Sequence, residues 1–570
     1  MKATRVNNQL FFGDNLHVLR DSIADASVDL IYLDPPFNSK RDYNLLFKTP
    51  KPPKAVKTGK SASALTAEEP EAEYGFGEAQ ITAFEDTWHW GRQAEDEFRE
   101  ILQHANTDVA ELMRALRSFL KENDMMAYLT AMCIRLLELH RVLKTTGSLY
   151  LHCDPTASHY LKIVLDGVFG PERFDSEIIW RRYGSHNDSK TFGAVHDTIL
   201  FYTKSSTFKF NKQHTAHEAQ YVEERFRFAD SDGRRWAEQN LSSPNPRPNL
   251  TYPFTAKNGI VYLPPANGWK YTAERMAQLD LDSRLHYPAR EGGRLRLKSY
   301  LDELPGAPVQ DVWSDLLAIG GSSPERLGYP TQKPIALLER IIAASSNEGD
   351  LVLDPFCGCG TAVHAAQKLG RRWIGIDITH LAVSLIERRL KEAFPGIAFE
   401  VHGTPTDIAA ARDLAERDKH QFQLWACGLV NAQPYQGGRK GADRGIDGLL
   451  YIEVGKNRTE KVIVQVKGGA NVTRANIATL KGDVEREKAA VGLFITLAEP
   501  TREMLREATA AGHFETPHHG AVPKIQVLTI QALLAGQRPQ LPDLSRGAQT
   551  FKKAGLEEQD GTKQQPGFDF

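Results

Sequence analysis

The sequence predicts an α/β fold with a mainly parallel sheet, followed by a second, smaller α/β unit. From Leu351 onwards strand and helix signals alternate as "LVLD", "TAVHAAQKLG", "RRWIGIDI" and "LAVSLIERRLKEAF". Near the start of the chain, "QLFFGDNLHVL" and "VDLIYLDPPF" show the same alternation. Strands that alternate with helices are typical of a parallel sheet covered by helices. The smaller unit is predicted over residues 416–536.

Composition indicates an ordinary globular protein of more than one domain. The chain has 570 residues, of which 41% are hydrophobic and 25% charged. No apolar run approaches the roughly 18 residues that span a bilayer, and "MKATRVNNQLFFGD" does not resemble a secretory signal, so we expect a cytoplasmic protein without a membrane segment. The five cysteines contain no C-x-x-C pair, which argues against a disulfide framework or a zinc site.

The remaining segments are predicted in order along the chain. Residues 48–79 are rich in Pro, Lys, Ala and Glu and are predicted to form a mobile insert. Helical periodicity extends from Phe98 to Leu143 and is followed by the strand "SLYLHCD". The next helix, "TASHYLKIVLDGVFG", is expected to end at Gly170. Residues 542–570 are predicted to be a disordered tail.

The middle of the chain, residues 171–310, is irregular, basic and rich in aromatic residues. Between Pro171 and Tyr300 there are 20 Lys and Arg against 15 Asp and Glu. A local basic surplus is compatible with a polyanionic partner although the whole chain has a net charge of -2. Arg181, Arg182, Arg234 and Arg235 are candidates for contacts with phosphate or guanine, or ordinary surface charges.

The loop "DPFCGCGT" opens a helix directly after a buried strand. Glycines there let the backbone approach a ligand, and the helix N-terminus favours polar groups. Asp377 ends the next strand, where an acid can bind the two hydroxyls of a ribose. The G-x-G-x-x-G spacing of nicotinamide-dinucleotide sites is absent. Alternatively, the glycines only permit a tight turn from strand to helix.

The loop together with "DPPF" resembles the S-adenosylmethionine-dependent amino-methyltransferases that act on DNA. "GDNLHVL" and "DPPF" come first, a variable region lies in the middle, and "YPTQKPIALLERII" with "DPFCGCG" comes last, which is the motif order of the permuted, or beta, class. The resemblance covers about residues 8–400. It implies a Rossmann-like methyltransferase domain over residues 1–400, with a target-recognition region within 171–310.

The resemblance also assigns the stretch Asp34, Pro35, Pro36 and Phe37 to the target amine. An aromatic amine is a poor nucleophile, and Asp34 together with the carbonyl of Pro35 would accept hydrogen bonds from its two N–H groups. Proline carries no competing N–H, and Phe37 would offer a flat face to the base. A stacked base cannot reach such a pocket, so it must be flipped out of the helix. An Asp at the first position favours the N6 of adenine, with the N4 of cytosine as the alternative.

The same family pattern implies the residues that bind S-adenosylmethionine. Asp14 would meet the adenine amine of the cofactor, and Thr331 with Lys333 would close over its methionine carboxylate. Lys333 read on its own is alternatively an exposed lysine before a helix. The methionine and ribose side would be lined by Asp354, Phe356, Gly358, Gly360, Thr361 and Asp377.

The C-terminal unit contains a predicted hairpin, "DGLLYIEV" and "KVIVQVK", around the turn "GKNR". Asp447 and Gln465 are equidistant from the turn and should face one another, and Lys467 lies on the same face as Gln465. These three groups suit a Mg²⁺ site for phosphodiester hydrolysis, with Asp447 and Gln465 as ligands and Lys467 as the catalytic residue. The pattern resembles the Mrr-type branch of the PD-(D/E)-x-K nucleases. An inactive DNA-binding relic is the alternative.

Three functional hypotheses follow. The first is a site-specific DNA methyltransferase that acts on the N6 of adenine in double-stranded DNA, fused to a restriction-endonuclease-like domain. The second is a defence nuclease whose methylase half mainly recognises DNA and senses the cofactor. The third is a modification enzyme whose C-terminal domain only binds DNA. The sequence predicts neither the recognition site nor the partners, so a homodimer and a separate restriction or translocase subunit both stay open.

Overall fold

The structure is a computed structural model, and it describes a large part of the chain. The described residues are 8–36, 42–47, 79–85, 88–184, 191–290, 292–320, 323–327, 329, 331–435, 445–455, 458–516, 520–541 and 557. Phe37 and all of the predicted mobile insert except Ala79 lie outside these ranges, as does the predicted disordered tail except Glu557. Among the described residues, those up to Asn211 and from Asp311 onwards form one compact unit, and Lys212–Gln310 form another. Within the described part of the chain, no helix is long and apolar enough to cross a membrane.

The first unit is built on a nine-stranded sheet, which confirms the predicted α/β fold. The sheet is parallel except at β7, which runs antiparallel to both of its neighbours. In spatial order the strands are β16 (Val312–Trp313), β6 (Phe174–Arg181), β7 (His196–Thr203), β5 (Leu143–Cys153), β2 (Val28–Leu33), β17 (Leu351–Asp354), β18 (Arg372–Asp377), β1 (Asn8–Phe12) and β19 (Phe399–His402).

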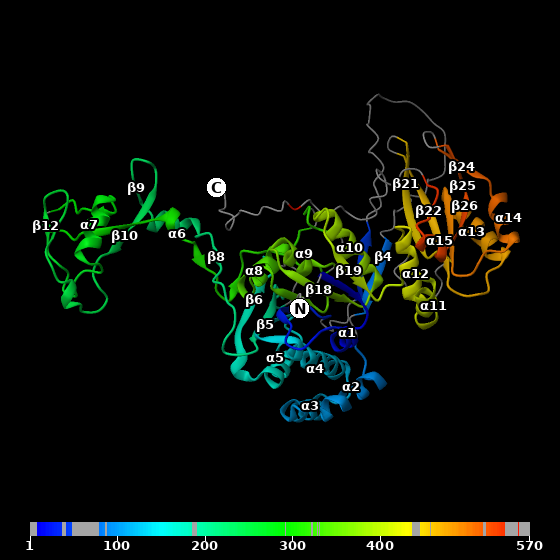
Figure 1. Ribbon diagram of the computed structural model, residues 1–570, viewed down its shortest axis with the longest axis horizontal. Helices are drawn as coiled ribbons and strands as arrows, with labels where there is room; N and C mark the ends of the chain where they lie inside the picture. The colour runs from blue at the N-terminus through cyan, green and yellow to red at the C-terminus, as the bar shows by residue number, and fades with distance from the viewer. Residues whose placement is uncertain are drawn as a thin grey trace, which may run out of the picture. The chain divides into compact units, whose positions relative to one another are not determined.

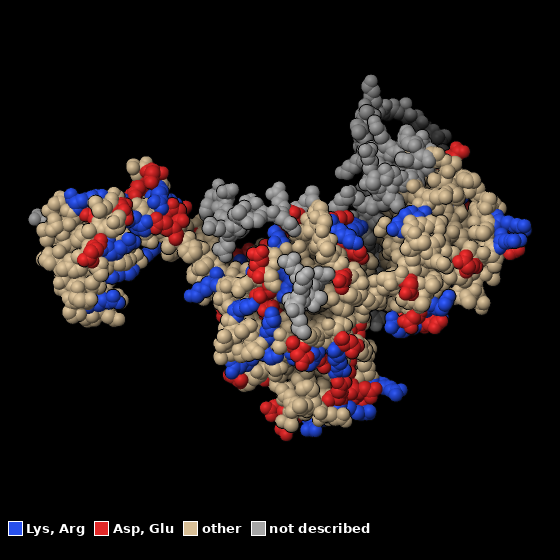
Figure 2. Space-filling model, viewed as in Figure 1, with Lys and Arg blue, Asp and Glu red and all other residues tan. Residues whose placement is uncertain are grey.

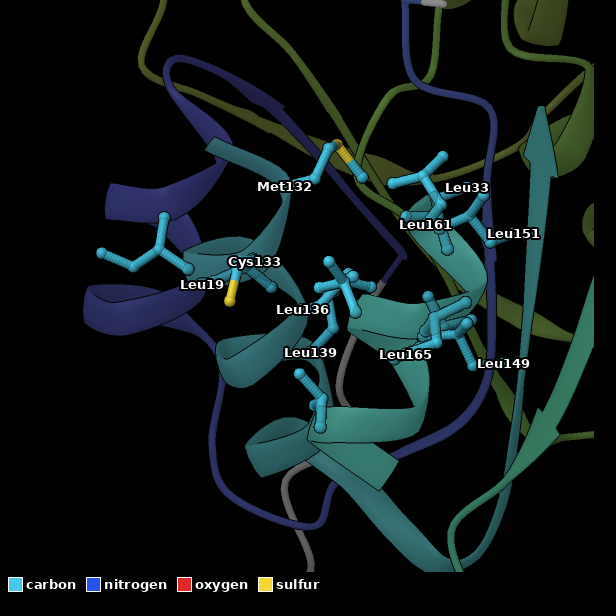
Figure 3. Close-up of a cluster of buried hydrophobic side chains, with 14 of the residues drawn as sticks. Leu19, Leu33, Met132, Cys133, Leu136, Leu139, Leu149, Leu151, Leu161 and Leu165 are labelled. Carbon is cyan, nitrogen blue, oxygen red and sulfur yellow. The ribbon is translucent and has the colours of Figure 1, made fainter. Parts of the chain in front are cut away.

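Helices cover both faces of this sheet. The helices α1 (Asn15–Ser22), α4 (Asp124–Val142) and α5 (Ser158–Phe169) lie on one face, and α8 (Ile335–Ser345), α9 (Thr361–Lys368) and α10 (His380–Ala393) on the other (Figure 1). Figure 3 shows leucines of α1, α4 and α5 that pack together with leucines of the neighbouring strands. The helix α4 is apolar on nearly all sides because it is buried on nearly all sides.

The stretch from Phe98 to Leu143 with predicted helical periodicity lies in three helices. They are α2 (Arg92–Gln103), α3 (Thr107–Leu120) and α4. Asn106 and Asn123 each accept a hydrogen bond from a backbone N–H in the first turn of the following helix, which is how an asparagine N-cap starts a new helix. The predicted end of α5 is confirmed, since Gly170 has a φ of 93° just after the helix.

The second unit holds most of the irregular middle region. Its main sheet has the order β13 (Leu285–His286), β14 (Arg296–Tyr300), β10 (Arg235–Asn240) and β9 (Phe228–Ala229), and α7 (Ala273–Leu281) contributes Met276 to the core. Residues 174–203 of the same region supply β6 and β7 to the large sheet instead. Basic and acidic side chains lie close together on the face around β10 that Figure 2 shows.

The C-terminal part of the first unit contains a five-stranded sheet. Its order is β20 (Gln433–Pro434), β21 (Gly448–Gly455), β22 (Arg458–Lys467), β23 (Val491–Thr496) and β26 (Ile525–Thr529). The predicted hairpin is β21–β22, and its register, Gly448 opposite Val464, is the expected one. One face packs on α12 (Lys419–Leu429), and the other packs on α13 (Arg474–Arg486) and α14 (Arg502–Ala510).

Two residues of α5 provide a test of the core. Leu161 is fully buried, whereas Ile163 on the same helix is 43% exposed. We expect Leu161→Ala to lower the free energy of unfolding of the methylase part by about 2–5 kcal/mol, because it removes buried contacts and leaves a cavity. Ile163→Ala should cost about 1 kcal/mol or less. Urea denaturation followed by circular dichroism measures both, and equal losses would contradict the assigned core.

Candidate functional site

The sheet brings together the two acidic motifs that the sequence singles out. The strands β2 and β17 are parallel neighbours, with Leu30 opposite Val352 and Ile31 opposite Leu353. Asp34 follows β2 directly, and Asp354 ends β17, so both carboxylates lie at the same edge of the sheet. Ligands of open parallel sheets bind in the crevice outside the carboxyl ends of the strands. This edge is therefore the candidate site.

The glycine loop after β17 has a backbone that only glycine fits well. Gly358 has a φ of +54°, and a Cβ there would lie 3.3 Å from the ring of Tyr329. Gly360 has a φ of +75°, and a Cβ there would lie 2.8 Å from Ile386 Cγ1. Thr361 begins α9 directly after the loop and is buried. The loop thus turns tightly into the helix, and Tyr329 and Ile386 pack against its two glycines.

Two buried carboxylates flank this loop. Asp354 Oδ1 accepts a hydrogen bond from Phe356 N at 3.0 Å, and Asp377 Oδ2 accepts one from Gly358 N at 2.8 Å. Burial raises the pKa of Asp354 to about 8, and the charges of Asp34 and Asp377 add to the effect. Burial also raises the pKa of Asp377 to about 6. Burial therefore disfavours the charged forms of both carboxyls, and a nearby cation would favour them.

Lys333 contacts the motif at the end of β2. Its Nζ donates a hydrogen bond to Asp34 Oδ2, and the side chains are only 10% and 16% exposed. Lys333 is therefore not an exposed lysine before α8. Pro35 is buried, Pro36 and Thr331 are half-buried, and Phe37 lies outside the described residues.

Asp14 lies after β1, next to the end of β18, where Phe12 is opposite Asp377. Asp14 Oδ1 caps α1 by accepting from Leu16 N at 2.8 Å, and Oδ2 accepts from Arg135 at 3.1 Å. Both oxygens of this predicted cofactor contact thus accept hydrogen bonds from protein groups.

Sequence reasoning missed the residues that connect the loop after β1 to the glycine loop after β17. Arg135 Nε donates to Asn15 Oδ1 at 2.7 Å, and Asn15 Nδ2 donates to the carbonyl of Pro355 at 2.9 Å. Asn15 thereby ties the loop after β1 to the loop after β17. A single arginine within the apolar helix "MMAYLTAMCIRLLELH" was the available signal, because a buried arginine needs acceptors around it.

A second missed feature is a buried polar chain beside Asp34. The Tyr32 hydroxyl lies 2.9 Å from His152 Nδ1, and His152 Nε2 lies 3.1 Å from Asp197 Oδ2. The other oxygen of Asp197 lies 3.2 Å from Arg182 Nε. Burial opposes ionisation of Asp197, but His152, Lys333 and Arg182 hold its pKa below its usual value. This chain fixes Tyr32, two residues before Asp34, in one orientation.

The candidate metal site of the C-terminal unit is assembled only in part. The ladder between β21 and β22 begins with Gly448 opposite Val464, and Asp447, directly before it, donates its backbone N–H to the carbonyl of Val464 at 2.8 Å. However, Asp447 Oδ1 accepts from Gln423 Nε2 at 2.9 Å and Oδ2 accepts from Val466 N at 2.7 Å. Gln465 is buried and donates to the carbonyl of Gly445, and Lys467 is half-buried. The described residues contain no group of three His, Cys, Asp or Glu that could hold a metal ion.

The fold and site define a class: an α/β protein with a largely parallel, doubly covered sheet and an acidic glycine loop at the carboxyl ends of its strands. Residues 28–388, more than half of the chain, match the N6/N4 family model described as DNA methylase, and the chain belongs to that family. Residues 428–534 match a model described as NACHT-associated inactive Restriction Endonuclease 1. The beta class and the Mrr-type branch stay predictions.

Individual relatives match parts of the chain. The type II methyltransferase M.EcaI of Enterobacter cloacae is 34% identical over 265 residues, which are 46% of this chain and 57% of that protein. The type III restriction-modification enzyme StyLTI Mod subunit of Salmonella typhimurium is 25% identical over 376 residues, 64% of this chain and 50% of that protein. The chain thus spans about half the length of these relatives. The solved PvuII DNA methyltransferase, cytosine-N4-specific, is 13% identical with a TM-score of 0.29, covering 67% of this chain and 86% of that one.

The raised pKa of Asp354 predicts a pH-dependent effect of removing its charge. Its carboxyl has a pKa of about 8 in the folded chain and an ordinary pKa near 3.8 when unfolded, so the folded state binds the extra proton and stability falls as pH rises between these values. Asp354→Asn should therefore increase the free energy of unfolding modestly at pH 5 and much more at pH 9.

Asp315 is the matched control, since Arg340 lowers the pKa of its carboxyl. Asp315→Asn should reduce stability similarly at pH 5 and pH 9, because that carboxylate is ionised in both states at both values. Thermal unfolding across this pH range measures all three proteins. A stabilisation by Asp354→Asn that does not grow with pH would contradict the assignment of a buried, strained carboxylate.

Proposed function

We propose that the chain is a DNA methyltransferase that transfers a methyl group from S-adenosylmethionine to the exocyclic N6 of adenine in double-stranded DNA, after the base is flipped out. The observation that carries the proposal is the parallel pairing of β2 with β17. It sets Asp34 of the D-P-P-F motif beside Asp354 and the glycine loop. A site for an amine and a site for a methyl donor are thus adjacent. The names of M.EcaI and the StyLTI Mod subunit support a methyltransferase of a restriction-modification system.

The residues present fit this cofactor. S-adenosylmethionine carries a sulfonium and an ammonium, and burial leaves Asp354 and Asp377 with raised pKa values that a cation would relieve. Gly358 and Gly360 keep side chains out of the loop, and Asp377 ends β18 where a ribose can be held through its hydroxyls. When bound, the sulfonium supplies an electrophilic methyl group. Asp354 and Asp377 would face its positive part, with Phe356 and Thr361 beside them.

The residues at the end of β2 would orient the amine. Asp34 and the carbonyl of Pro35 accept from its two N–H groups, so that the nitrogen lone pair points along the sheet edge towards the glycine loop. The chain Tyr32–His152–Asp197 holds the end of β2 in place. Direct transfer depends mainly on alignment, and proximity of this kind is worth up to about 7–11 kcal/mol. Asp34 at the first position favours adenine, with the N4 of cytosine as the alternative.

The unit Lys212–Gln310 is proposed as the target-recognition region, with double-stranded DNA as the partner. Three of the four arginines considered for DNA contact have structural roles, since Arg182 pairs with Asp197. Arg234 binds Asp302 and Glu303 and stacks on Tyr300, and Arg235 donates to the carbonyls of Val222 and Phe226. A role on DNA places the protein in the cytoplasm. A separate restriction subunit is proposed from the StyLTI Mod relative.

The C-terminal domain is proposed to bind DNA without cutting it. Both carboxylate oxygens of Asp447 accept hydrogen bonds from protein groups, and the second acid of the nuclease pattern is Gln465. The match to a family described as inactive supports the same conclusion. Mg²⁺ at Asp447 and Gln465 with Lys467 as catalyst is the alternative.

The transfer reaction is tested with tritium-labelled S-adenosylmethionine and unmethylated genomic DNA. Asp34→Asn keeps the shape but removes the charge that accepts the amine hydrogen bond, so we expect about 100-fold or greater loss of label. Asp315→Asn, on an exposed ion pair with Arg340, should keep full activity. Mass spectrometry should find N6-methyladenine. No label on any DNA with folded protein would overturn the proposal.

The C-terminal domain is tested with supercoiled plasmid and Mg²⁺, with and without prior methylation. We expect no nicked or linear product beyond that of Lys467→Met, because the carboxylate oxygens at Asp447 are already occupied by protein donors. Gel-shift titration should show that the plasmid is still bound. Cleavage that needs Mg²⁺ and disappears in both Lys467→Met and Asp447→Asn would contradict the proposal and restore the nuclease alternative.

A further inference from the structure

The ion pair of Lys333 with Asp34 lies between the two halves of the proposed site. The ammonium donates to the carboxylate that should receive the target amine. Its charge also acts on Cys359, in the glycine loop, and on Asp197. Tyr329, four residues before it, packs against Gly358. The segment that carries Tyr329 and Lys333 therefore contacts both the end of β2 and the glycine loop.

The ion pair and the proposed reaction make competing demands on Asp34. An ammonium and an exocyclic amine are both N–H donors, and both would use the same carboxylate. With side chains 10% and 16% exposed, both partners have little contact with water. A buried charge that loses its partner is strongly destabilised, so an anion that receives the ammonium favours its movement away from Asp34.

We propose that Lys333 is a gate operated by the methyl donor. Without the donor, its ammonium occupies Asp34 and excludes the target amine. The amino-acid carboxylate of a donor bound at the glycine loop draws the ammonium away and frees Asp34 for the base. The inference rests on the proposed function and adds an order to it, with the donor bound before the base is captured. Because linkage is reciprocal, a captured base also favours the donor.

The gate has a measurable consequence in the absence of DNA. Where Lys333 is held by Asp34, only the fraction of molecules with a free ammonium can receive the donor's carboxylate, and the apparent affinity falls by that fraction. Removing the charge of Asp34 should therefore tighten binding of a ligand that carries the carboxylate. S-adenosylhomocysteine is the suitable probe, since it lacks the sulfonium that Asp34 would attract directly.

The experiment is calorimetric titration of the full chain with S-adenosylhomocysteine. We expect Asp34→Asn to lower Kd about fivefold or more, within the usual range of coupling between sites. In the Lys333→Met background the same substitution should leave Kd unchanged, which makes the effect a coupling between the two residues. 5′-Methylthioadenosine, which lacks the amino-acid group, should bind wild type and Asp34→Asn equally. Asp315→Asn should leave both ligands unaffected.

The outcomes separate the gate from the proposed function. Binding of S-adenosylhomocysteine with the same Kd in wild type and Asp34→Asn overturns the gate while the cofactor site stands. The gate is also overturned if Asp34→Asn changes the Kd for S-adenosylhomocysteine equally in the wild-type and Lys333→Met backgrounds. A change in the Kd for 5′-methylthioadenosine on Asp34→Asn overturns it as well. Absence of binding to folded wild type overturns the cofactor site and the gate together. If Lys333→Met does not fold, the comparison of the two ligands in wild type and Asp34→Asn still decides.

Discussion

The parallel pairing of β2 with β17 is the constraint on which the candidate site depends. Asp34 and Asp354 are 320 positions apart in the chain, and one backbone ladder brings their strands together. Because parallel strands end at the same edge, no further device is needed to place the two motifs near each other. Asn15 reinforces the arrangement, since it ties the loop after β1 to the carbonyl of Pro355. The long middle region can be inserted between these strands without disturbing the edge.

Electrostatics at that edge explain why the site suits a cation. Asp34, Asp354 and Asp377 converge there, while Lys333 compensates Asp34. Asp197 is compensated separately by His152 and Arg182, whereas burial raises the pKa values of Asp354, Asp377 and also Asp154, which follows β5. A positively charged ligand at the glycine loop would supply the missing charge. The position of Lys333 matters for the same reason, because its ammonium is the cation that pairs with Asp34 at this edge and its segment also contacts the glycine loop through Tyr329.

Sequence patterns predicted the strands and helices of the methylase part because their periodicity is local. The run from Leu351 to Ala393 and the register of the C-terminal hairpin, with Gly448 opposite Val464, follow directly from it. The division of the stretch after Phe98 into three helices depends on two asparagine caps, which the apolar period does not encode. The partners of Lys333, Arg135 and His152 come from segments distant in the chain. Only the fold brings them together, so side-chain pairing within the site was beyond sequence reasoning.

The central claim is that segments at the two ends of the methylase part form one ligand site. Hydrogen–deuterium exchange of the full chain with and without S-adenosylhomocysteine tests it most directly. Peptides covering residues 28–36 and 351–361 should gain protection together, at the same ligand concentration, while residues 445–467 do not change. Protection confined to one of the first two segments, or found only in the C-terminal domain, would contradict a shared site at the ends of β2 and β17.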